Sequence, residues 1–93
     1  MTNDRIERIA KMEARIAALP ALNDYLAERV ASASILLAAA RFSEERGHVN
    51  KASASEDSAY RILGFVSEEI ARDPKGSAAR RGFAMTYRTV QAV

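Results

Sequence analysis

The 93-residue sequence contains no cysteine, no tryptophan and a single histidine, His48. Without cysteine there is no disulfide framework, no reactive thiolate and no cysteine-based metal site. Only two prolines and four glycines interrupt the chain. Strands are not expected either, because β-branched and aromatic residues nowhere alternate at period two for more than a few positions.

Long apolar runs are also scarce. The longest, residues 30–42, follows Arg29 and contains Arg41. It is too short to cross a bilayer, which needs about 20 apolar residues. The charged N-terminal residues lack the apolar centre of a signal peptide. We therefore expect a cytoplasmic protein without a membrane partner.

The composition that remains is that of an ordinary globular chain. Hydrophobic residues make up 48% and charged residues 28% of the sequence, a balance that favours a folded core over disorder. The length suits one domain. We predict a single helical domain over residues 1–93.

Apolar spacing of three and four predicts the first two helices. Asn3 or Asp4 can cap the first, whose stripe continues to Leu19. Pro20 ends that helix or begins the next. The second helix is predicted from residue 21 or 23 to 46, with Gly47 as its stop.

The second half of this second helix is apolar on opposite sides. Ala33, Leu37 and Ala40 share one face, whereas Ile35 and Phe42 fall on the other. A helix that is apolar all round must be covered all round. We therefore predict a central, largely buried second helix, and we expect either the other helices or a second subunit, in a homo-oligomer, to cover its second face.

The third helix is predicted to begin at a capping box, Ser53 to Glu56, after a polar connection over residues 47–52. A fourth helix is expected to begin at Pro74 or after Ser77 and to reach about residue 90. The predicted fold class is all-α, a small bundle of three to four helices. The predicted core residues of the third helix are Ala59, Ile62, Leu63, Val66 and Ile70.

Two residue pairs around His48 have spacings known from catalytic sites. Glu45-x-x-His48 has the spacing of di-iron ligands in ferritin-like bundles. Because Gly47 is expected to end the helix before His48, we favour a solvent-exposed loop histidine.

Arg41 and His48, which are separated by six residues, resemble the Arg-x(4–6)-His signature of small all-α ribonucleases of the HEPN type. The resemblance implies RNA cleavage in a cleft between two subunits. Phe42 stands where that family commonly has a polar residue. Since no phosphate loop, nucleophile motif or paired-acid constellation is found, we predict that the protein is not an enzyme and uses no metal or cofactor.

The C-terminal segment is basic. Residues 74–93 hold four cations and no acid, a net charge of +4. Because the whole chain has a net charge of only +2, residues 1–73 have a net charge of −2. Such cations can meet phosphates. A nucleic-acid-binding module is therefore our alternative interpretation.

Apolar groups on charged faces favour protein recognition instead. Phe65 lies beside Arg61 and Glu69, and Met85 lies between two arginines; Met and Arg are enriched at protein interfaces. We predict a non-enzymatic protein-binding protein, an inhibitor, adaptor or assembly factor, that acts through the fourth helix and the flank of the third. The candidate partner-binding residues are Phe65, Lys75, Arg80, Arg81, Met85 and Arg88.

Overall fold

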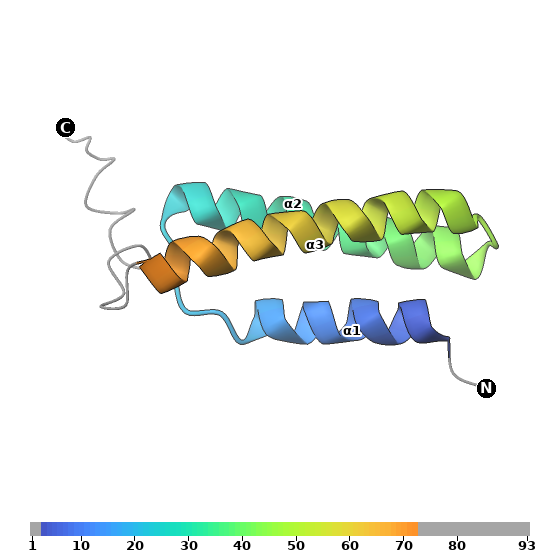
Figure 1. Ribbon diagram of the computed structural model, residues 1–93, viewed down its shortest axis with the longest axis horizontal. Coiled ribbons are helices and arrows are strands. Elements are labelled where there is room, and N and C mark those ends of the chain that lie inside the picture. Colours follow the sequence, from blue (N-terminus) through green and yellow to red (C-terminus); the bar gives the residue numbers. More distant parts are fainter. Residues whose placement is uncertain (1–2, 73–93) are drawn as a thin grey trace.

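The computed structural model describes residues 3–72. In this part of the chain it consists of α1 (Asp4–Ala17), α2 (Asp24–Glu45) and α3 (Val49–Arg72). The helices α2 and α3 form a hairpin, and α1 lies along it (Figure 1). The predicted all-α class is confirmed, whereas the expected fourth helix lies outside the described residues. Among the described helices, none is long and apolar enough to cross a membrane.

The starts of α1 and α2 follow from asparagine caps. The Asn3 side chain accepts a hydrogen bond from the Ile6 amide at 3.1 Å, and the Asn23 side chain accepts one from the Leu26 amide at 2.9 Å. Each satisfies one backbone donor that the first helical turn leaves unpaired. Pro20 lies in the connection between these two helices, after the end of α1 at Ala17 and before the start of α2 at Asp24; the chain breaks near Pro20 as predicted, but Pro20 is not the first residue of α2.

The α2–α3 turn is tight because Gly47 adopts a positive φ of 79°. The Gly47 amide donates to the Glu44 carbonyl at 3.1 Å, and the His48 amide donates to the Ser43 carbonyl at 2.8 Å. This is the Schellman pattern of a helix C-terminus. Gly47 is therefore the stop that the sequence predicts.

The predicted start of α3 is wrong. The helix begins at Val49, and its first turn closes when the His48 carbonyl accepts the Ala52 amide at 3.0 Å. Residues 49–52 of the predicted polar connection, and the whole predicted capping box, are thus helical. The reason is packing, because Ala52 is fully buried and Glu56 is 7% exposed, on the same stripe as the rest of the α3 core.

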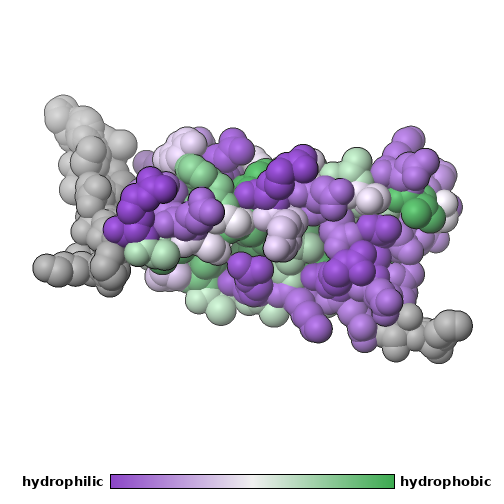
Figure 2. Space-filling model, viewed as in Figure 1, coloured by the Kyte–Doolittle hydropathy of each residue, from purple (hydrophilic) through white to green (hydrophobic). Residues whose placement is uncertain are grey.

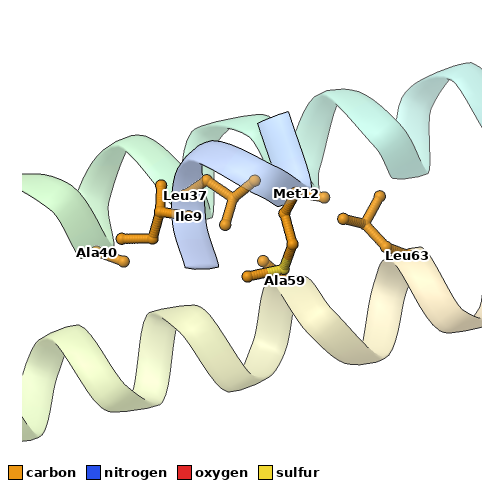
Figure 3. Close-up of a cluster of buried hydrophobic side chains, with 7 residues drawn as sticks. Ile9, Met12, Leu37, Ala40, Ala59 and Leu63 are labelled. Carbon is orange, nitrogen blue, oxygen red and sulfur yellow. The ribbon is translucent and has the colours of Figure 1, made fainter. Parts of the chain in front are cut away.

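The core is formed where all three helices meet (Figure 3). Ile9 and Met12 enter from α1 and pack on Leu37 of α2 and Leu63 of α3. Small alanines between them allow close approach of the backbones. The cluster comprises Ile9, Met12, Ala33, Leu37, Ala40, Ala59 and Leu63.

The description of α2 as largely buried requires a correction. Leu37 is 0% exposed, but on the opposite side Ile35 is 70% and Phe42 is 55% exposed. The other two described helices both pack against one side of α2, so the side facing away from them meets neither. Within residues 3–72, α2 is therefore buried on one side and exposed on the other.

Candidate functional site

The exposed side of α2 carries a continuous apolar stripe. Ala31, Ile35, Ala38 and Phe42 follow one another at spacings of four, three and four, and all four are exposed. We call these four residues the outer stripe. At about 100° per residue, Ala31, Ile35 and Phe42 lie roughly 120–160° around the helix from the buried Leu37, and Ala38 lies about 100° from it. An exposed apolar patch of this kind is typical of an interaction surface.

No charged residue lies between Arg29 and Arg41. Most positions that flank the outer stripe are small, with Ser32, Ser34 and Ala39 exposed; the exception is Arg41, next to Phe42, which pairs with Glu13. Another helix could therefore come close to the α2 backbone without having to displace long side chains or bury charge. In contrast, hydrophilic side chains cover most of the face shown in Figure 2.

An arginine marks the C-terminal end of the outer stripe. The guanidinium carbon of Arg46 lies 4.0 Å from the centroid of the Phe42 ring, a cation–π contact. Phe42 nevertheless remains 55% exposed. Its ring is therefore both oriented and accessible, as an anchor residue at an interface needs to be.

Phe65 is the only predicted partner-binding residue within the described part of the chain. Its ring contacts Tyr25 of α2 edge to face, with centroids 6.2 Å apart and planes at 87°. It is 38% exposed, so the prediction that it lies off the core is consistent with the structure. The other five, Lys75, Arg80, Arg81, Met85 and Arg88, lie outside the described residues.

A groove between α1 and α3, with a volume of about 420 Å³, was not anticipated from the sequence. Arg8, Lys11 and Arg15 line its α1 side, and Tyr60, 64% exposed, lines its α3 side. The spacing of three and four between Arg8, Lys11 and Arg15 could have indicated a shared basic face of α1. Glu56 neutralises Arg8, however, so the groove has a mixed charge.

At one end of this groove, four charged side chains join the three helices. The Arg5 Nε lies 2.8 Å from Glu44 Oε1, and the Arg5 guanidinium also pairs with Glu56. The Arg8 Nε lies 2.5 Å from Glu56 Oε2, and the Asn3 amide donates to Glu44 Oε2 at 2.9 Å. We call Arg5, Arg8, Glu44 and Glu56 the charge cluster.

The charge cluster shifts the protonation of its members. Hydrogen bonds from Arg8 hold the pKa of Glu56 below its ordinary value against the opposing effect of burial. The amide of Asn3, followed by Arg5, lowers the pKa of Glu44. The hydrogen bond to Glu56 raises the pKa of Arg8. Since these groups satisfy one another, we assign them a structural role.

The proposed pairs around His48 do not form a common site. Arg41 pairs with Glu13 of α1, and His48 is exposed in the turn after Gly47. Because the left-handed Gly47 interrupts the helix, Glu45 and His48 do not share one helical turn. Within residues 3–72 no group of three metal-binding side chains comes together.

No family model, curated protein or solved structure matches this chain. The four members of the outer stripe present only hydrocarbon and one aromatic ring, which suits contact with an apolar surface.

Proposed function

We propose that this protein is a non-enzymatic protein-binding helical bundle, an inhibitor, adaptor or assembly factor, whose main contact surface is the outer stripe of α2. The observation that carries the proposal is the exposure of Ile35 and Phe42 at 70% and 55%. Ile35 lies on a stretch of α2 that has no charged residue from 30 to 40, and Phe42 follows that stretch directly after Arg41. Such a stretch is normally covered.

The flank of α3 at Phe65 and the basic C-terminal residues form a second proposed surface. Phe65 retains an exposed edge beside Tyr25. Arg81 and Arg88 fit either an acidic protein or a nucleic acid. Nucleic-acid binding predicts an affinity that falls steeply with salt, whereas binding through an apolar stripe depends weakly on salt.

The experiment compares two equivalent substitutions in the full chain. Ala38→Glu places a carboxylate in the outer stripe, and Ala54→Glu places one at an exposed position of α3. Both are used as baits in crosslinking and affinity capture with quantitative mass spectrometry. We expect Ala38→Glu to lose the proteins that the native chain retains, and Ala54→Glu to keep them. Equal retention by both variants contradicts the proposed surface.

A further inference from the structure

Resting on the proposed function, we infer that the partner of the outer stripe is a second copy of this chain, bound through an antiparallel α2–α2 contact. Spacings of four, three and four are those of the a and d positions of a coiled-coil seam. Along the stripe, small and large residues alternate, in the order Ala31, Ile35, Ala38 and Phe42. This alternation determines how two copies fit.

Ile35 and Phe42 occupy a positions, and Ala31 and Ala38 occupy d positions. In an antiparallel pair, an a position faces a d position of the other helix. Ile35 then faces the partner's Ala38, and Phe42 faces the partner's Ala31. Every large side chain meets a small one, which fills the space evenly. In a parallel pair, Phe42 would meet Phe42 and Ala38 would meet Ala38, which leaves both crowding and gaps. The stripe is thus complementary to itself about a two-fold axis.

Charged residues at the two ends define the register. Glu28 precedes the outer stripe and Glu45 follows it. A slip of one heptad in either direction would place Glu45 against Ile35 or Glu28 against Ala38, and would take a carboxylate out of water. In the proposed register Glu28 faces the partner's Glu45 at each end, beyond the apolar layers and in contact with water, with Arg29 and Arg46 next to them in the sequence.

The flanking positions fit the same register. Ser32 falls opposite the partner's Ala39, and both are small and exposed. Tyr25, 58% exposed, falls opposite the partner's Arg46, the residue that already stacks on Phe42. The contact involves four apolar layers, so we expect a reversible dimer with a dissociation constant on the order of micromolar.

The first test is the mass of the full chain in solution, measured by sedimentation equilibrium. We expect the mass to rise with concentration from 10.2 kDa toward twice that value. Ala38→Glu should weaken the dimer by about tenfold or more at unchanged helicity, whereas Ala54→Glu should behave like the native chain. A constant mass of 10.2 kDa at millimolar concentration overturns the proposal.

The second test is disulfide crosslinking, which is clean because the native chain has no cysteine. Ile35→Cys and Ala38→Cys chains are oxidised separately and as a mixture. The antiparallel register predicts that the mixture crosslinks much faster than either variant alone. If each variant crosslinks as fast with itself as in the mixture, the contact is parallel and the proposed register is wrong.

The two proposals can fail separately. A monomeric chain whose Ala38→Glu variant still loses a different captured protein leaves the proposed function standing and removes the dimer. In the opposite case, Ala38→Glu breaks the dimer but the capture of all proteins other than the chain itself is unchanged. This result supports self-association and limits the outer stripe to that role.

Discussion

Two aliphatic residues of α2, two positions apart, have opposite surroundings. Leu37 is 0% exposed and packs in the three-helix core, whereas Ile35 is 70% exposed. Apolar burial stabilises by roughly 25 cal/mol per Å² of surface removed from water. The two side chains have similar volume and are both aliphatic. Their contributions to the stability of the monomer therefore differ because one is buried and the other is exposed.

Truncation of both residues measures this difference. We expect Leu37→Ala to lower the free energy of unfolding by about 3 kcal/mol, because it leaves a cavity in a packed core. Ile35→Ala should change it by less than about 0.5 kcal/mol in protein dilute enough to be monomeric. Urea unfolding followed by circular dichroism gives both values. Similar losses for the two variants would contradict the placement of the α2 faces.

At the scale of elements, the ends of the helices are set by short-range hydrogen bonds. Asn3 and Asn23 cap α1 and α2, and Gly47 closes α2 at a φ of 79°. Only glycine adopts this conformation at little cost, because a Cβ would crowd the backbone. The other described glycine, Gly64, lies inside α3, and an added Cβ would meet no atom within 4 Å there.

These two glycines predict effects of opposite sign for the same substitution. Gly47→Ala should destabilise the protein by about 1 kcal/mol, because alanine is strained at positive φ. Gly64→Ala should stabilise it by about 0.5–1 kcal/mol, because alanine loses less entropy in a helix. Thermal unfolding of the two variants beside the native chain checks the sign. Stabilisation by Gly47→Ala would show that the turn is not left-handed.

At the scale of the whole molecule, α1 is held against the α2–α3 hairpin by two kinds of contact. Ile9 and Met12 are buried in the core, and the charge cluster joins the N-terminal part of α1 to both other helices. The apolar contact does not depend on pH. The charge cluster does, because the pKa values of Glu44 and Glu56 are lowered in the folded state.

The lowered pKa values predict acid sensitivity. The two carboxylates contribute their stabilisation above their unfolded pKa of about 4.3, and this is lost as the pH falls through their lower folded values. We expect the free energy of unfolding to decrease below about pH 4.3, with α1 exchanging its amide hydrogens sooner than α2 and α3.

The variant Glu56→Gln tests the origin of this effect, with Glu68→Gln at an exposed position of α3 as its control. Glu56→Gln should lower stability at pH 7 by about 2 kcal/mol and should reduce the dependence on pH. If Glu56→Gln and Glu68→Gln have the same pH profile, the charge cluster does not cause the acid sensitivity.

The sequence by itself determined the features whose causes lie within a few residues. Asparagine caps, the glycine stop and apolar spacing are local, so the approximate ends of α1 and α2 and the shared face of Ala33, Leu37 and Ala40 could be predicted. The position of Phe65 off the core stripe of α3 also followed from spacing alone.

Only the tertiary structure decided features that depend on neighbouring helices. The buried Glu56 is paired with Arg5 and Arg8 of α1, 51 and 48 positions away in the chain, and α3 begins at Val49, ahead of the buried Ala52 and Glu56. A stripe with spacing of three and four through Ala52, Glu56 and Ala59 was present in the sequence, but it competed with an equally good capping box. Likewise, the spacing gave α2 two apolar faces, and the packing of α1 and α3 on one side left the outer stripe exposed.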